Sequence, residues 1–207
     1  SVLKNIKISG GSIDKIENIN FSGMLSVHHV PGVELFDLEL MNNHKGDDTM
    51  RAISSDVKAN KIRLSNCFGD CIDFDYSSGE VSNIIMKNAG NDGLDFMSSD
   101  FIVDEFYIDK CGDKGISIGE NSNIKASNIK INYCEIGIAS KDRSIGYFNN
   151  LNISNSNIGL TTYVKNWRYA IPGIIKEKNT KFENNNFNKK FESGDYLKIK
   201  EENYFKK

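Results

Sequence analysis

Aspartates recur at a fixed interval in the middle of this 207-residue chain. Asp95 follows Asp73 at an interval of 22 positions, and Arg51 and Ser117 occupy the same place one interval before and after them. Two carboxyl groups held side by side either raise the pKa of one member or bind a cation. A pair that shares a proton can act as general acid and as base or nucleophile on a glycosidic bond. The sequence therefore makes Asp73 and Asp95 candidates for an acid–base pair.

A second charged series has the same interval and adjoins the first. It consists of Asp48, Asp70, Asp92 and Lys114. Several carboxylate oxygens gathered in one place can hold Ca²⁺, so a calcium site is an alternative to acid–base chemistry. Two non-functional alternatives also stand: Asp next to Gly often caps its own turn, and the strand acids are alternatively solvated or paired with lysine.

Further charged residues continue the same side of the chain, where they either pair with the acids or contact a sugar. As substrate-binding candidates the pattern indicates Asp48, Arg51, Asp75, Lys114, Glu120 and Lys141.

The interval itself comes from a repeat that runs through most of the chain. One apolar series keeps the same interval throughout and consists of Ile72, Leu94, Ile116, Ile138 and Leu160. A second series consists of pairs that alternate with polar residues, as half-buried strands do, and it runs Ile62/Leu64, Ile84/Met86, Phe106/Ile108, Ile129/Ile131 and Leu151/Ile153. A repeat of this length with short strands and no helical periodicity predicts an all-β fold, a single-stranded right-handed parallel β-helix or solenoid.

Small and turn-forming residues repeat in phase with these strands. The glycines Gly93, Gly115, Gly137 and Gly159 are expected to form a left-handed corner, where positive φ costs glycine little. A column of small residues is predicted from Cys67, Ala89, Cys111, Cys134 and Ser156, and Asn66, Asn88 and Asn155 beside it are expected to form an amide ladder. The cysteines are read most simply as a buried thiol stack, with a Cys111–Cys134 disulfide as the alternative.

The repeat organises the chain as one domain over residues 1–207. Residues 1–45 are expected to form irregular N-terminal coils, residues 46–163 regular coils, and residues 164–207 a C-terminal coil and cap. The chain begins within a strand pattern, which is compatible with a removed leader or an upstream domain.

Charge and hydropathy exclude two classes of partner. The formal net charge is −2, so the chain offers no general attraction for nucleic acid. No apolar run is long enough to span a bilayer, so no membrane span is expected.

Several segments resemble a β-helix region found beside CotH-like domains in bacterial surface proteins, and more broadly the pectate-lyase-like superfamily. The segments are FSGMLSVHHV, GDDTM, GDCIDFDYSSG, GNDGLDFMSS, GDKGISIGENS, GIASKDRS and YVKNW, within roughly residues 20–168. The resemblance implies a carbohydrate ligand. By analogy with polygalacturonases, which use three aspartates on adjacent coils, it implies catalytic roles for Asp73, Asp95 and Asp92, although the GHG and RIK segments of those enzymes are absent.

Two hypotheses of function follow. The first is a secreted or cell-surface β-helix that binds, and in its stronger form cleaves, a polysaccharide or cell-surface glycan along the acidic face. The second is a non-catalytic stalk or recognition module that adjoins another domain and whose aspartates are structural.

Overall fold

The computed structural model describes residues 1–12 and 14–191, and within these residues every regular element is a β-strand. The strands form two rows that face each other across one core. The long row consists of β1 (Val2–Ser9), β5 (Val33–Met41), β7 (Asp56–Cys67), β9 (Ser78–Ala89), the first parts of β11 (Asp100–Gly119) and β12 (Asn123–Lys141), β13 (Ile145–Ser154) and β15 (Ile174–Glu183). The short row consists of β4 (Gly23–His28), β6 (Asp48–Ile53), β8 (Asp70–Asp75), β10 (Leu94–Met97), the second parts of β11 and β12, β14 (Ile158–Tyr163) and β16 (Phe187–Phe191).

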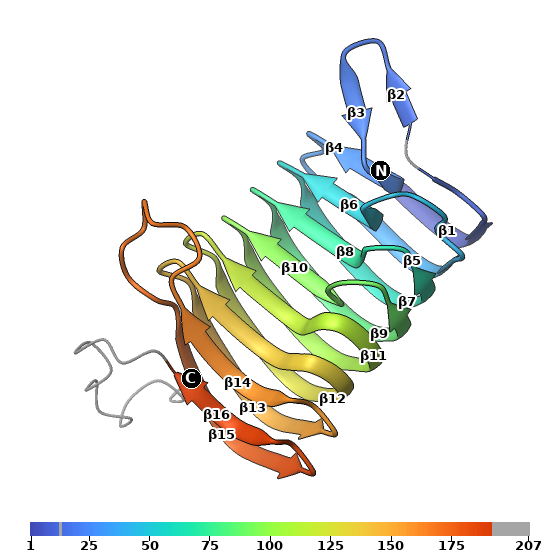
Figure 1. Ribbon diagram of the computed structural model, residues 1–207. Helices are drawn as coiled ribbons and strands as arrows, with labels where there is room; N and C mark the ends of the chain where they lie inside the picture. The colour runs from blue at the N-terminus through green and yellow to red at the C-terminus, as the bar shows by residue number, and fades with distance from the viewer. Residues whose placement is uncertain (13, 192–207) are drawn as a thin grey trace.

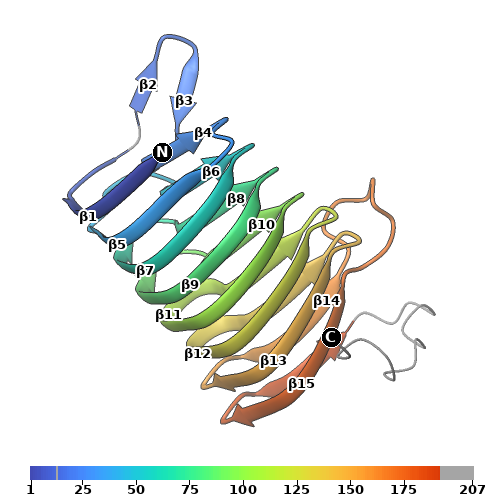
Figure 2. The ribbon, with the colours of Figure 1, turned by 180° about the vertical axis from the view of Figure 1, so that it is seen from behind.

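Each coil contributes one strand to each row, and the coils stack in parallel from β1 to β16 (Figures 1 and 2). Leu94 pairs with Ile72 on one side and with Ile116 on the other, so residues one sequence interval apart are spatial neighbours. The predicted fold class, a parallel β-solenoid whose coils repeat at this interval, is therefore confirmed. No helix in the described residues is long and apolar enough to cross a membrane.

The core consists of the inward apolar columns that the sequence pattern predicted. Alternate residues of the long strands point inward and are buried, because a parallel strand between two neighbours must bury one face. Behind the short row, the rings of Phe74, Phe96 and Phe101 pack with centroids 4.3–5.4 Å apart. This aromatic layer lies under the strands that carry Asp73 and Asp95, and supports them.

The glycine column has a different cause from the one expected. Among the described glycines only Gly10 and Gly79 have positive φ, so the prediction of a left-handed corner at Gly93, Gly115, Gly137 and Gly159 is wrong. These positions are close approaches of stacked coils. A Cβ on Gly115, for example, would lie 2.7 Å from the carbonyl oxygen of Gly137. Glycine is required there for space.

Asparagine is the most frequent residue at the left-handed corners of the described chain. One such column, with φ between 54° and 70°, is Asn66, Asn88, Lys110, Tyr133 and Asn155. Asn tolerates this conformation better than most residues do. The amide ladder exists in two separate pieces: Asn88 donates to Asn66 over 3.0 Å, and Asn155 donates to Asn132 over 2.8 Å.

All four cysteines form disulfides, Cys67–Cys71 and Cys111–Cys134. The interpretation as a stack of buried thiols is therefore wrong, whereas the alternative Cys111–Cys134 bridge is present. The expected column of small residues is confirmed, because Cys67, Ala89, Cys111 and Cys134 are register partners in turn.

Both ends depart from the regular coil. A hairpin of β2 (Asp14–Ile16) and β3 (Ile19–Phe21) is inserted between β1 and β4 and stands off the N-terminal end (Figure 1). At the other end, a loop over residues 164–173 precedes the last described coil, β15 and β16. The remainder of the expected cap, residues 192–207, lies outside the described residues.

Candidate functional site

A cavity of about 260 Å³ opens on the outer side of the short row, at the strands that carry the aspartate series. It is lined by Asp47, Asp48, Arg51, Asp70, Asp73, Asp75, Asp95, Phe96, Met97, Gly119, Glu120, Lys141, Asp142 and Lys165. We call it the acidic cavity. Its side chains come from consecutive coils, on or beside β6, β8, β10, β11 and β12, because the strands of the short row pair in register.

Most of the side chains that the sequence singled out lie in this cavity. Those that line it are Asp48, Arg51, Asp73, Asp75, Asp95, Glu120 and Lys141. Asp92 and Lys114 are not among the lining residues. They lie in the adjoining turn column, where the backbone N–H and the ammonium group of Lys114 both bond to Asp92.

Asp73 and Asp95 face the cavity as direct register partners on β8 and β10. Residue 73 also pairs with Arg51 on β6, and residue 95 with Ser117 on β11, as the sequence interval predicted. Neighbouring strands in a sheet are about 4.8 Å apart, so two carboxyl groups at paired positions lie close to each other. This spacing permits one proton to be shared between them or transferred to a ligand.

Arg51 is the principal counter-charge at the N-terminal side of the cavity. Its Nε lies 3.2 Å from an oxygen of Asp73 and 3.1 Å from an oxygen of Asp75, and its Nη1 donates to the hydroxyl of Ser22 over 2.7 Å. The same hydroxyl donates to Asp48, which lies 3.8 Å from Nε of Arg51. One guanidinium therefore serves three carboxyl groups, and its own rotamer is held by Ser22.

The pKa values of three cavity carboxyls are raised mainly by burial. Burial and the neighbouring Asp75 raise the pKa of Asp73 to about 9, against the opposing effect of Arg51. Burial raises the pKa of Asp70 to about 7, with Asp92 adding to the effect, and raises that of Asp48 to about 6. Asp73 is therefore expected to keep its proton at neutral pH, as a general acid requires.

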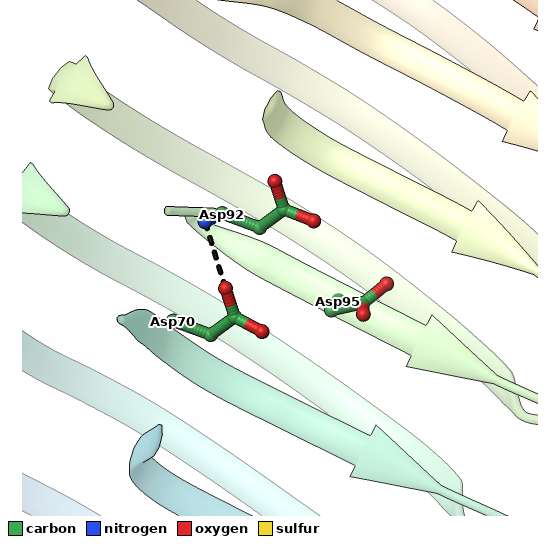
Figure 3. Close-up of side chains that lie close together, drawn as sticks. All are labelled: Asp70, Asp92 and Asp95. Atoms are coloured by element: carbon green, nitrogen blue, oxygen red, sulfur yellow. Dashed lines mark hydrogen bonds between the residues drawn. The ribbon is translucent and has the colours of Figure 1, made fainter. Parts of the chain in front are cut away.

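A second group of carboxyls adjoins the first. Asp70, Asp92 and Asp95 each bring one oxygen within 4.8 Å of the others, and they come from neighbouring strands and turns (Figure 3). Asp70 also accepts the backbone N–H of Asp92 over 2.8 Å, the bond drawn in Figure 3. These three are the residues that could hold a hard cation such as Ca²⁺, which takes oxygen ligands. Only Asp95 among them belongs to both the group and the predicted acid–base pair.

The C-terminal side of the cavity carries the cationic groups. Lys141 is buried and donates from Nζ to the hydroxyl of Ser117 over 2.7 Å. Burial lowers the pKa of Lys141, although Asp95 opposes this. Lys165 lies in the loop after β14, and Glu120 in the turn after β11, at a left-handed φ of 60°. One end of the cavity is therefore acidic, and the other end carries both acidic and cationic side chains.

Two contributors were absent from the sequence prediction. Ser22 and Lys165 lie in the irregular segments before and after the regular coils, where the repeat interval does not apply. Asp142, directly after Lys141, also lines the cavity, with just 1% of its surface exposed. The repeat in the sequence cannot predict the positions of residues that lie in segments outside the repeat.

A larger hollow of about 730 Å³ lies on the long row, where it crosses β7, β9, β11 and β12. The only carboxyl among its lining residues is Glu105, and Lys130 lies 5.4 Å above the ring of Tyr107. Because it lacks paired carboxyls, it offers surface for contact but no acid–base chemistry.

Comparison of the chain with protein-family models, with curated proteins and with solved structures finds no match.

Proposed function

We propose that the protein binds a polysaccharide or cell-surface glycan at the acidic cavity and hydrolyses a glycosidic bond there. The observation that carries the proposal is the register pairing of Asp73 and Asp95 inside a cavity, with the two carboxyls in different surroundings. Asp73 has a raised pKa and a neighbouring arginine, whereas Asp95 has no hydrogen-bond or ion-pair partner within the described chain. Two carboxyls with separate roles are what glycoside hydrolysis requires.

In the proposed reaction, Asp73 donates its proton to the glycosidic oxygen as the bond to the leaving sugar breaks. Asp95 acts on the opposite side of the same bond, as nucleophile or as the base for a water molecule. The strand spacing of about 4.8 Å is close to the carboxyl separation of about 5–5.5 Å in retaining enzymes. The proposal therefore favours retention of anomeric configuration, with Asp95 as the nucleophile.

As part of the same proposal, we infer that the chain is related to pectate-lyase-like proteins and to CotH-associated β-helices. We also infer that it is secreted or lies on the cell surface. The solenoid fold supports the relationship at the level of architecture only. The two disulfides support the location, because disulfides persist mainly in oxidising compartments.

The test is a screen of polysaccharides for new reducing ends. We expect Asp73→Asn and Asp95→Asn each to lower the rate by about 10²–10⁴-fold. Glu80→Gln is the matched control, since Glu80 is an exposed carboxylate on the long row and should leave the rate unchanged. Equal rates in all variants would assign any activity to another site.

A non-catalytic recognition or stalk module is the second candidate, and the contacts of Arg51 favour it. Because Arg51 already pairs with Asp73 and Asp75, part of the acidic cavity is neutralised from within the chain. Absence of cleavage across a broad panel, together with retained glycan binding, would favour this module over the hydrolase.

A further inference from the structure

The acidic cavity has a strong excess of acidic side chains. Eight carboxyl side chains line it, against three cationic ones, Arg51, Lys141 and Lys165. Arg51 is already engaged by the carboxylate of Asp75, Asp73 is expected to keep its proton at neutral pH, and Lys141 donates to Ser117. The cations of the chain itself therefore leave several carboxyls without a counter-charge, and a cavity of this sign repels an anionic ligand.

Asp142 provides a second and independent observation. Its Oδ1 accepts the backbone N–H groups of Lys165 and Asn166 over 2.8 and 2.9 Å, which fixes the carboxylate in place. Its Oδ2 is buried without a hydrogen-bond partner, although the residue lines the cavity and is only 1% exposed. Buried acceptors almost always have a partner, and the described chain supplies none to this oxygen, so a donor from a molecule in the cavity would satisfy it.

Asp95 adds a second acceptor without a hydrogen bond to the same cavity. It has no hydrogen bond or ion pair with any described residue, while its register neighbours Asp73 and Ser117 are both engaged. A ligand that satisfies Asp95 and Asp142 must bring hydrogen-bond donors and, because the cavity is acidic, positive charge. An ammonium group supplies both, with three donors and a compact charge.

We propose that the glycan carries free, unacetylated amino sugars, and that the acidic cavity binds their ammonium groups through Asp95 and Asp142. This inference rests on the proposed function, since it names the class of glycan for that same cavity. The cavity volume of about 260 Å³ is below the usual range of about 300–1,000 Å³ for drug-sized ligands, so it suits a single sugar of a longer chain.

The test compares ligands that differ in charge and in scaffold. Binding of the full chain is measured by calorimetry at neutral pH and low salt. The ligands are glucosamine oligomers, N-acetylglucosamine oligomers of the same length, galacturonate oligomers, spermidine as an ammonium without a sugar, and Ca²⁺. We expect the glucosamine oligomers to bind at least about tenfold more tightly than the acetylated ones, and the difference to shrink as salt screens the charges.

Variants then connect the binding to the two acceptors. Asp142→Asn removes the charge, keeps the shape and suits the left-handed φ of 53°, and it should weaken glucosamine-oligomer binding about tenfold. Asp95→Asn, at a half-buried position without partners in the described chain, provides the same test if Asp142→Asn folds poorly. Glu80→Gln should leave the affinity unchanged.

The outcomes separate this inference from the proposed function. Equal or tighter binding of acetylated or galacturonate oligomers would overturn the amino-sugar assignment and leave glycan binding intact. Spermidine or Ca²⁺ binding as tightly as the oligomer, with the same loss in Asp142→Asn, would replace the glycan by a simple cation. Failure of every oligosaccharide to bind would overturn the proposed function itself.

Discussion

Asp95 lies directly beside Asp73 on the next coil, because β8 and β10 pair in parallel with these two residues in register. The pairing places a carboxyl with a raised pKa next to one that makes no hydrogen bond or ion pair within the described chain. Both side chains open into the acidic cavity, with Arg51 on one side and Lys141 on the other. Stability and the proposed function therefore depend on the same few charges, and the two can be measured separately.

Stability should fall as the pH rises from neutral to about 9. Burial holds the pKa of Asp73 at about 9 in the folded chain, above its ordinary value of 3.8, so the folded state keeps a proton that the unfolded state has lost. The free energy of unfolding then decreases through this window, by at most about 1.4 kcal/mol per pH unit for one proton. Chemical denaturation at several pH values measures the slope.

Asp73→Asn should flatten this slope between about pH 8 and 9, where Asp48 and Asp70, with pKa values of about 6 and 7, have largely lost their protons. Asp37→Asn is the control, because a hydrogen bond from Lys61 holds the pKa of Asp37 below its ordinary value. A slope that is the same in Asp73→Asn and in the unmodified chain would contradict the assignment of the proton to Asp73.

Arg51→Met should destabilise the chain by about 2–3 kcal/mol. The change leaves Asp75 and Asp48 buried without their counter-charge, and breaking a buried pair costs about 3–5 kcal/mol, which we reduce because Arg51 is 26% exposed. Arg63→Met is the matched control on the long row. Arg63 is 46% exposed and pairs with Asp37, so its loss should cost about 0–1 kcal/mol. Equal costs in urea denaturation would show that Arg51 is not a central counter-charge.

The register of the site was accessible from the sequence, whereas its detailed contacts were not. Periodic apolar residues such as Leu94 fix which positions stack, and this places Asp73 and Asp95 side by side. The pattern could not show that Arg51 reaches past Asp73 to Asp75 and Ser22, because a long side chain selects partners beyond its own row. Lys165 was not predicted because its loop interrupts the repeat.

The glycine column illustrates a second limit. A repeated glycine has two physical explanations, a positive φ or a close approach, and the sequence pattern is identical for both. Gly115 lies at a close approach of two coils, while the left-handed corner is formed by Asn66, Asn88 and the residues stacked on them.

Gly115→Ala should therefore destabilise the chain through steric overlap. Its Cβ would lie 2.7 Å from the carbonyl oxygen of Gly137 and 2.8 Å from Cγ2 of Ile131, neither of which can move without disturbing a neighbouring coil. Overpacking of this kind typically costs about 1–3 kcal/mol. Gly32→Ala is the control, because nothing lies within 4 Å of its added Cβ. A Gly115→Ala variant as stable as Gly32→Ala in thermal and chemical denaturation would contradict the close-approach explanation.

The two disulfides should contribute unequally to stability, since they close loops of different length. Cys111 and Cys134 are 23 residues apart, and Cys67 and Cys71 only 4 apart. The loop-entropy relation gives about 3 kcal/mol for the longer loop and about 2 kcal/mol for the shorter one. Serine replaces each pair with little change in volume, and Ser156 already occupies the position next to Cys134 in the same column. Denaturation of the two double-serine variants, with and without reductant, measures each contribution.

If reductant left the unmodified chain unchanged, or if four free thiols were titrated, the bridges would have no stabilising role. A larger loss from the Cys67–Cys71 pair would instead show that contacts at that corner outweigh loop entropy.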